Sequence, residues 1–441
     1  MSRSSLSLRA CRELDARLAS VLATPGAELS GLAVVAVRGD EVVYEGYFGH
    51  RTFDMTGLTG VLPVDRDTRF RVASISKAVT GIGVMRLVEK GLLDLDADLS
   101  GRLGFVLKNP HYPEAAITAR MLLSHTSSLR DADFYFPPFP HRIEELFVPP
   151  GRHYQGGAHF AGPSGNNAPG RRYCYCNLGY GLLGTCIERI SGRRFDRYMQ
   201  EEVLDPLGID GSYNVNLISE AGFGTISPLY RKAPGGEGPW DPRGPWIPQV
   251  DDFRGVRPAM PVRVDAAPGA PRPTLEDYVL GTNGALFSPQ GGLRISALDL
   301  SKIMRVLMND GASAGVRLLE GRTVGAMMSR QWKHDPGKNN GEVSGFTRET
   351  GLALMHTSDT RDDQGSDFVV ERGGVNLWGH HGDAYGLLGG MLFEPEEQWG
   401  FLYLIGGTSV PPAEHRGRFS SFFIWEEEIN TGVVEALRRS R

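Results

Sequence analysis

Cysteine is scarce in this sequence, and long apolar runs and basic clusters are missing. The 441 residues include four cysteines, too few for a disulfide framework in a chain of this length. No apolar run is long enough to cross a bilayer. The net charge of −5 is spread along the chain, so we expect no nucleic-acid partner and no membrane partner. The content of 41% hydrophobic and 22% charged residues is typical of a soluble globular protein.

The N-terminal residues 1–25 have the pattern of an amphipathic helix, with leucines spaced among charged residues. This segment lacks the compact apolar core and the small-residue cleavage site of a signal peptide. We therefore expect a cytoplasmic protein.

Both ends of the chain predict mixed α/β structure. The expected elements are a β-hairpin at 31–37 and 41–47, a helix at 297–308, strands at 389–393 and 401–405, and a final helix at 422–438. A chain of this length also predicts two structural domains rather than one core.

The middle of the chain has a different character. Helical patterns at 118–123, 180–190 and 194–203 are separated by two long irregular segments, 131–170 and 228–273. Both segments carry aromatic residues among prolines and glycines. Loops of this length are usually functional or disordered, and their rings need a surface to pack on, so we expect lids or binding walls.

These patterns predict a discontinuous α/β domain made of residues 1–73 and 290–441. Residues 74–289 then form a mainly helical insertion with aromatic-rich loops. A cleft at the seam between the two is where an active site is expected.

The motif Ser74-Ile75-Ser76-Lys77 is the most informative stretch of the chain. An apolar run with helical spacing follows it, so a helix is expected to begin at or just after Ser74. Residues three apart share a helix face, which sets the Lys77 amine beside the Ser74 hydroxyl. A serine hydroxyl becomes a good nucleophile when such a neighbour accepts its proton. Lysine is scarce here, and no other lysine has a serine three residues before it.

A second motif is Tyr175-Cys176-Asn177. Tyr175 can act as a general base if a nearby cation lowers its pKa, and Lys77 would be that cation. The Asn177 amide can bind a substrate carbonyl and hold Lys77 in place. The two cysteines beside Tyr175 have no further ligands spaced for a metal, so we interpret them as core or pocket-wall thiols.

A third motif, His380-His381-Gly382, comes just before the strand expected at 389–393. Gly382 would let a substrate lie close to the backbone. The next N–H group, that of Asp383, can pair with the Ser74 N–H as an oxyanion hole. We therefore count all four residues, His380 to Asp383, as oxyanion or substrate-binding candidates.

Each motif also has a structural interpretation. Ser74 can be a helix N-cap and Tyr175 a core tyrosine, while the two histidines can be a hydrogen-bonded pair or part of a metal site with Asp383. Taken together and in this order, the motifs supply a nucleophile, a base and an oxyanion hole, which are the groups that acyl transfer requires. Ser313 lies in a G-x-S-x-G pattern, but a helix rather than a strand is expected before it, so we do not assign it a role.

With these motifs, residues 30–435 resemble the serine β-lactamase-like superfamily. The similar branch contains class C β-lactamases, D-alanyl-D-alanine carboxypeptidases, D-aminopeptidases and family VIII carboxylesterases. Residues 122–129 look like its L-L-x-H-T-S-G-L signature, with Ser128 in place of the usual glycine. Residues 206–209 and 291–296 also match sequence patterns that are common in this branch.

The resemblance implies a fold and a set of catalytic roles, and the sequence differs from class C β-lactamases at the third motif. The implied fold is an antiparallel sheet flanked by helices, with the site between the sheet and a mainly helical second domain. Ser74 would be acylated, Lys77 would be its proton partner, and Tyr175 would be the base. Class C β-lactamases carry K-T-G as third motif, whereas this chain has His380 in the lysine position, which argues against efficient β-lactam hydrolysis.

The sequence thus predicts a serine hydrolase or acyltransferase without a cofactor. It would act on a small ester or amide, with water, an alcohol or an amine as acceptor. The alternatives are a D-amino-acid peptidase or amidase, a weak β-lactamase, a metal-dependent hydrolase at the third motif, and a catalytically inactive binding or sensor protein.

Overall fold

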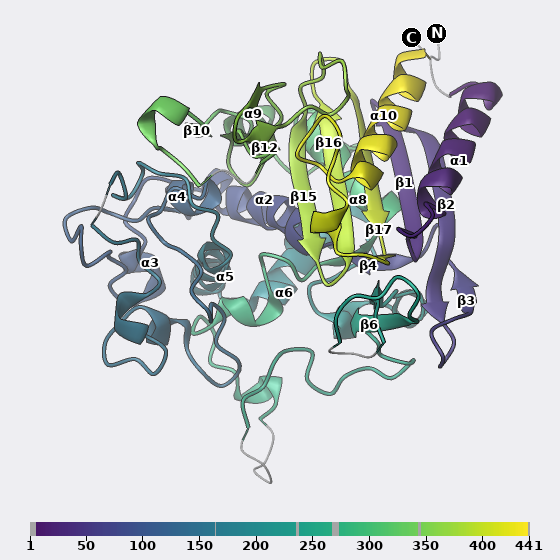
Figure 1. The fold of residues 1–441 in the computed structure, drawn as a ribbon. Coiled ribbons are helices and arrows are strands. Elements are labelled where there is room, and N and C mark those ends of the chain that lie inside the picture. Colours follow the sequence, from purple (N-terminus) through teal and green to yellow (C-terminus); the bar gives the residue numbers. More distant parts are fainter. Residues whose placement is uncertain (1–5, 164, 235–237, 267–272, 343–344, 440–441) are drawn as a thin grey trace.

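A nine-stranded antiparallel sheet forms the centre of one half of the molecule (Figure 1). The computed structural model describes residues 6–163, 165–234, 238–266, 273–342 and 345–439. In spatial order the strands are β10 (Trp332–Lys333), β11 (Glu349–Thr350), β12 (Met355–His356), β15 (Trp378–Ala384), β16 (Leu387–Glu394), β17 (Trp399–Ile405), β1 (Gly31–Arg38), β2 (Glu41–Phe53) and β3 (Gly60–Pro63).

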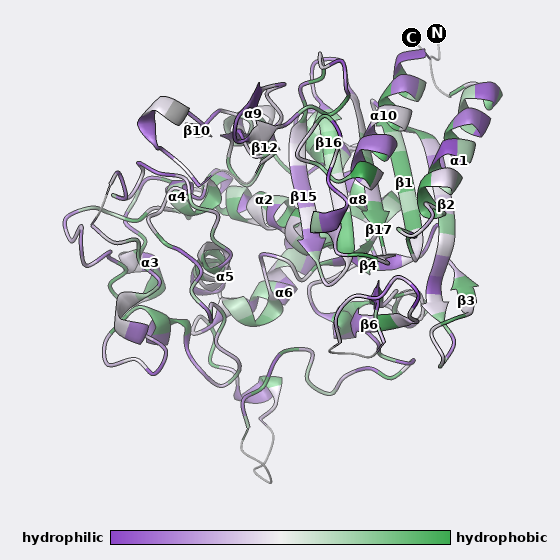
Figure 2. Ribbon diagram, viewed as in Figure 1, coloured by the Kyte–Doolittle hydropathy of each residue, from purple (hydrophilic) through white to green (hydrophobic). Residues whose placement is uncertain are grey.

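The sheet is buried on both faces, which explains the continuous apolar sequences of its central strands. In β1, Val34 belongs to one hydrophobic core and its neighbour Val35 to the other, because successive side chains of a strand point to opposite faces. Helices α1 (Leu8–Leu22) and α10 (Ile424–Arg439) cover the first face. They lie side by side near both chain ends, and their outer surfaces are hydrophilic (Figures 1 and 2).

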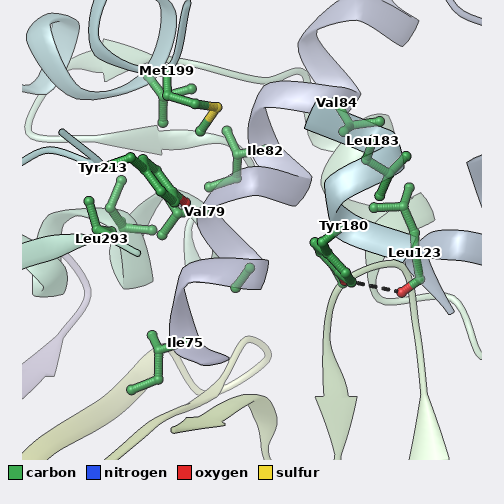
Figure 3. Packing of buried hydrophobic residues seen from close by; sticks show 14 of the residues in the cluster. Ile75, Val79, Ile82, Val84, Leu123, Tyr180, Leu183, Met199, Tyr213 and Leu293 are labelled. Carbon is green, nitrogen blue, oxygen red and sulfur yellow. Dashed lines mark hydrogen bonds between the residues drawn. The ribbon is translucent and has the colours of Figure 1, made fainter. Parts of the chain in front are cut away.

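The second face of the sheet packs on α8 (Ala297–Met308) and α2 (Ser76–Glu89). Unlike α1, α2 is buried nearly all round, so it shows no polar stripe. Figure 3 shows side chains of α2 between two groups of buried residues. One group is Met199, Tyr213 and Leu293, and the other is Leu123, Tyr180 and Leu183. The first turn of α2 is therefore held firmly between the sheet and the helical layer.

The helical layer lies beside the sheet on the side of α2 (Figure 1). Its helices are α3 (Ser100–Leu103), α4 (Ala119–Leu123), α5 (Leu178–Ser191), α6 (Phe195–Met199), a π-helical turn (Gln200–Leu204) and α7 (Glu220–Phe223). Helix α9 (Gly321–Met327) precedes the edge strand β10.

Smaller sheets complete the fold. They are β4 (Arg69–Arg71) with β7 (Arg294–Ser296), β5 (Leu229–Lys232) between β6 (Trp246–Val250) and β18 (Gly407–Thr408), β8 (Ala312–Ser313) with β9 (Val316–Arg317), and β13 (Arg361–Asp362) with β14 (Gly365–Ser366). The β4–β7 pair ties the segment before Ser74 to the strand before α8.

Most elements expected from the sequence are confirmed. The hairpin is β1–β2, the helix at 297–308 is α8, and the two later strands are β16 and β17. The N-terminal helix spans Leu8–Leu22, and residues 1–5 of its predicted range lie outside the described residues. The division into two domains remains a prediction.

One prediction about the middle of the chain is wrong. The segment 228–273 is not irregular throughout, because it contains β5 and β6. These strands pair with each other and β5 also pairs with β18, more than a hundred residues away. Such long-range pairing leaves little local pattern in a stretch rich in proline and glycine. Within the described part of the chain, no helix combines the length and apolarity that a membrane span needs. A cytoplasmic location remains a prediction.

Candidate active site

The nucleophile candidate Ser74 lies in a tight turn that leads into α2. The 3-10 turn Ala73–Ile75 precedes the α-helix, which starts at Ser76. This confirms the helix expected at or just after Ser74. Ala73 has a φ of +46°, a left-handed conformation that is strained for a residue with a Cβ atom. The turn leaves Ser74 half-buried in the wall of a cleft.

Lys77 is fully buried and its amine reaches Ser74. Its Nζ donates hydrogen bonds to Ser74 Oγ at 3.0 Å, to Asn177 Oδ1 at 2.7 Å and to the Gln290 carbonyl at 3.0 Å. These acceptors match the three N–H bonds of an ammonium group. Burial nevertheless lowers the pKa of Lys77 to about 7, an effect that the charge of Asp131 partly offsets. The amine therefore changes its protonation state near neutral pH while touching the serine hydroxyl.

Asp131 holds Asn177 in the orientation that Lys77 requires. Its Oδ2 accepts from the Asn177 backbone N–H at 3.0 Å and from Asn177 Nδ2 at 2.8 Å, while its Oδ1 accepts from the Leu178 N–H at 2.9 Å. The carboxylate thus satisfies N–H groups at the start of α5 and leaves Asn177 Oδ1 facing Lys77. Asp131 was not predicted from the sequence, because the residues that it binds lie 46 and 47 positions away.

Tyr175 lies beside both Ser74 and Lys77. Its side chain interacts with that of Ser74, and Lys77 Nζ lies 4.7 Å from its ring centroid. The ring stacks on His125 with centroids 4.4 Å apart, and His125 Nδ1 accepts from the Cys176 N–H at 3.0 Å. The histidine of the 122–129 signature therefore positions the tyrosine.

The expectation that Lys77 lowers the pKa of Tyr175 is wrong. Burial raises the pKa of Tyr175 well above its ordinary value, and the interaction with the Ser74 side chain offsets this only in part. Removal of the phenol from water is the main cause of the shift, although the lysine nitrogen lies over the ring face. At neutral pH Tyr175 is a neutral phenol that can donate or relay a proton.

Ser128 stands where the signature usually has glycine. It adopts a φ of +66°, a region that glycine enters more easily than other residues. Asn109 Nδ2 donates to its hydroxyl, and this hydrogen bond helps a serine to occupy the left-handed position.

The third motif lies on a strand, β15, and its side chains alternate between the two faces. His380 faces Lys77, whose charge acts on it. Its Nδ1–H donates to the His381 carbonyl at 2.7 Å, and burial lowers its pKa to about 3. His380 is therefore neutral and does not replace the missing lysine as a cation.

His381 points away from the cleft. Its ring packs against Phe346 and Phe422 at centroid distances of 4.8 and 5.0 Å, and its Nδ1 has no hydrogen-bond partner in the described part of the chain. The structure thus brings His380 to the site but not the His381 side chain.

Gly382 and Asp383 border the site in different ways. A Cβ atom on Gly382 would lie 2.6 Å from the Val72 carbonyl and 3.4 Å from the Ala73 Cβ. The glycine therefore lets β15 approach the turn that carries Ser74, rather than making space for a substrate. Asp383 is exposed at the cleft, and partial burial raises the pKa of its carboxyl.

The cleft has a volume of about 420 Å³, within the range of small-molecule sites. Ser74, Asn177 and Asp383 all line it. Both long segments also contribute, with Tyr135, Phe136, Pro137 and Pro138 from the first and Val250, Asp251, Phe253, Met260, Val262 and Arg263 from the second. Both segments therefore form walls of the cleft, and their role in binding a substrate remains a prediction.

Other candidates lie outside the cleft. Ser313 is in the β8–β9 hairpin and is not followed by a helix. The side chains of the 380–383 segment point to opposite faces and do not converge on a metal position. Among the described residues, one group has ligand atoms within 4.8 Å of one another, and it consists of His141, Glu145 and His153. The cysteines are free thiols, and Cys176 is buried with its Sγ donating to Asp131 Oδ1 at 3.6 Å.

The sheet flanked by helices, with a helical layer beside it, defines a β-lactamase/transpeptidase-like fold. The sequence profile described as Beta-lactamase matches residues 18–421. The chain therefore belongs to the beta-lactamase family, and both the fold and the family expected from the sequence are confirmed. This family of serine hydrolases and acyltransferases supports an enzyme.

Individual relatives share about half or less of their length with this chain. Penicillin-binding protein 4* of Bacillus subtilis (strain 168) is 29% identical over 189 residues, which are 42% of this chain and 39% of that protein. ML-236A carboxylate methylbutanoyltransferase of Penicillium citrinum is 29% identical over 201 residues, 41% of this chain and 46% of that protein. The chain thus spans less than half the length of the curated relatives it matches.

Solved structures match over the whole fold. The D-amino acid amidase of Ochrobactrum anthropi SV3, complexed with L-phenylalanine amide, superposes with a TM-score of 0.66 and 18% identity. The match covers 98% of this chain and 99% of the amidase. At this identity the likeness concerns the fold.

Proposed function

We propose that the protein is a serine hydrolase or acyltransferase that forms an acyl-enzyme on Ser74 from a small ester or amide. One observation carries this proposal. The buried amine of Lys77, with a pKa of about 7, lies 3.0 Å from Ser74 Oγ. A serine hydroxyl in contact with a base of that pKa can be activated at neutral pH.

In the acylation step, Ser74 Oγ attacks the substrate carbonyl carbon and its proton passes to the neutral amine of Lys77. The tetrahedral intermediate then collapses and the bond to the leaving alcohol or amine breaks. The leaving group takes a proton from the Tyr175 hydroxyl, which regains one from the Lys77 ammonium. Backbone N–H groups of Ser74 and Asp383 receive the negative charge of the carbonyl oxygen.

In the second step, water, an alcohol or an amine attacks the acyl carbon and gives its proton to Lys77. The Ser74 alkoxide leaves and is reprotonated by the Lys77 ammonium. The proton transfers in these two steps are the same for hydrolysis and for acyl transfer. The acceptor therefore decides between a carboxylesterase-like hydrolase and an acyltransferase.

Two observations bear on the acceptor. The cleft wall contains aromatic side chains from both long segments, which suit a bulky, partly apolar donor or acceptor. One relative is named as a methylbutanoyltransferase acting on ML-236A carboxylate. Both favour a small-molecule alcohol or amine acceptor beside water.

A D-amino-acid amidase is the second candidate, favoured by the whole-fold similarity to a D-amino acid amidase. Matched D- and L-amino-acid p-nitroanilides separate it from an esterase. β-Lactam hydrolysis is expected to be weak, because the third motif offers the neutral His380 instead of a cation. A catalytically inactive binding protein would react with neither substrate.

The experiment that tests the proposal is intact-mass spectrometry after brief exposure to 4-nitrophenyl butyrate. The wild type should gain one acyl group, the Ser74→Ala variant none, and Ser313→Ala, the control for the second serine motif, one. Faster nitrophenol release with an added amine would assign acyl transfer. A wild type that gains no acyl group and releases no nitrophenol contradicts the proposal.

A further inference from the structure

Three arginines line the cleft beside Ser74, and they differ in how their charges are balanced. Arg294 forms a buried ion pair with Asp251 through two hydrogen bonds of 2.7 and 2.9 Å. Arg71 and Arg263 have no carboxylate within 4.0 Å among the described residues. The cleft therefore contains two guanidinium groups whose charges the described residues leave without an ion pair.

Arg71 lies three residues before the nucleophile, on β4. Its Nε donates to the Gly291 carbonyl at 3.0 Å, and the guanidinium lies 5.3 Å from the Tyr385 ring centroid. Its two terminal nitrogens donate no hydrogen bond to any described residue. Burial lowers the pKa of Arg71 to about 10, so it keeps its charge at neutral pH. The fixed Nε leaves the terminal N–H groups available to a ligand in the cleft.

Arg263 reaches the same cleft from the second long segment. It is exposed, and its guanidinium stacks over Phe136 at 4.5 Å from the ring centroid. Its carbonyl accepts from the Phe139 N–H at 2.9 Å, which joins the two long segments. Its positive charge is close enough to act on Arg71. The Asp251 carboxylate also acts on Arg71, but its two oxygens are hydrogen-bonded to Arg294. An anion bound between Arg71 and Arg263 would therefore lessen the repulsion between their like charges.

We propose that Arg71 and Arg263 form a subsite for a carboxylate on the substrate of Ser74. The inference rests on the proposed function. A planar guanidinium binds a carboxylate through paired N–H bonds, and this geometry sets orientation as well as affinity. Asp383 also lines the cleft and has no arginine within ion-pair distance among the described residues, so it does not neutralise either guanidinium by direct contact. The subsite supplies the cation that the neutral His380 does not.

The test compares esters that differ by one carboxylate. On the acyl side the pair is mono-4-nitrophenyl adipate and 4-nitrophenyl hexanoate. On the leaving-group side it is 3-carboxy-4-nitrophenyl hexanoate and 4-nitrophenyl hexanoate. In at least one pair the wild type should have the higher kcat/KM for the anionic ester. Arg263→Met should lower that anionic-to-neutral ratio by about tenfold, since a charge-assisted hydrogen bond is lost.

Matched variants keep the result interpretable. Arg254 lies on the same segment, is exposed, pairs with Asp252 at 3.0 Å and does not line the cleft. Arg254→Met should leave the ratio unchanged. Arg71→Met loses a backbone hydrogen bond and can unfold the turn, so Arg71→Lys is compared with it, with thermal unfolding as the check on folding. Lysine keeps the positive charge but lacks the paired N–H groups of a guanidinium, so Arg71→Lys should retain part of the preference for the anionic ester.

The outcomes separate the two proposals. If the neutral ester acylates Ser74 but Arg263→Met leaves the anionic-to-neutral ratio of kcat/KM unchanged in both pairs, the subsite is overturned and the proposed function stands. If no ester acylates Ser74, the proposed function fails, and calorimetry on Ser74→Ala still tests the subsite. There, monomethyl adipate should bind more tightly than dimethyl adipate, and Arg263→Met should remove the difference. Equal binding of the two esters overturns the subsite.

Discussion

The two sides of the cleft are built in different ways. On the nucleophile side, hydrogen bonds of 3.0 and 2.7 Å join Lys77 to Ser74 and Asn177, and the amine is fully buried. On the loop side, Phe136 and Arg263 come from long segments with few regular elements and are half-buried or exposed. The groups proposed to react are therefore fixed by helix ends and strands, whereas those that meet the rest of the substrate lie on loops, where change is tolerated best.

The largest expected effect comes from breaking the nucleophile side. Ser74→Ala should abolish turnover of 4-nitrophenyl butyrate. Lys77→Ala and Tyr175→Phe should each lower kcat/KM by ~10³ or more, because the groups act as one unit. Steady-state kinetics of the three variants checks this, with Ser313→Ala as the control. Near-normal turnover by Ser74→Ala would remove the basis of the mechanism.

Asp131 tests whether the contacts behind the nucleophile matter as much as the nucleophile itself. We expect Asp131→Asn to lower kcat/KM by about 10²-fold, since Asn177 and Lys77 lose the group that orients them. The effect should appear mainly in kcat, because Asp131 does not line the cleft.

The pH profile gives this variant a second readout. Wild-type kcat/KM should rise as the pH increases through about 7, where Lys77 loses its proton and can act as base. The Asp131 charge raises the pKa of Lys77, so Asp131→Asn should move this rise to lower pH. A rise that stays in place, or moves to higher pH, would mean that another group controls acylation.

Local and non-local signals explain which parts of the site were predictable. Ser74 and Lys77 were found because three residues of one helix turn set their distance. Asp131 was not, since it acts through N–H groups far along the chain. His381 was misplaced because the motif was interpreted as preceding the strand. Because successive side chains of β15 point to opposite faces of the sheet, His381 points away from the face that carries His380.

The fold shows the same division. Apolar periodicity predicted α8 and the β1–β2 hairpin, which depend on neighbouring residues. The strands β5 and β6 were missed because part of their pairing is with β18 at the far end of the chain. The burial that keeps Tyr175 protonated also depends on packing, which no sequence spacing reveals.

Gly382 tests the contact between β15 and the nucleophile turn. An added Cβ would meet the Val72 carbonyl at 2.6 Å, so Gly382→Ala should destabilise the fold by about 1–3 kcal/mol and lower kcat about tenfold by shifting Ser74. Gly325, in α9, is the control, because nothing lies within 4 Å of its added Cβ. Gly325→Ala should stabilise the protein by about 0.5–1 kcal/mol. Chemical denaturation measures both, and equal stabilities would show that β15 tolerates displacement.

The smallest expected effect lies on the loop side and sharpens the comparison. Phe136→Ala removes an aromatic wall of the cleft and the surface on which Arg263 stacks. KM should rise about three- to tenfold, and kcat should change less than about twofold, because the lost contacts act on ground state and transition state alike. Phe134 lies two residues away, does not line the cleft, and packs on His153 and on Phe136 with centroids 4.7 and 6.3 Å apart. Phe134→Ala should therefore raise KM less than Phe136→Ala does, because it weakens the support of Phe136 without removing the cleft wall. A Phe136→Ala variant whose kcat falls more than its KM rises would show that the loop also aligns the reacting groups, and the separation between the two sides of the cleft would not hold.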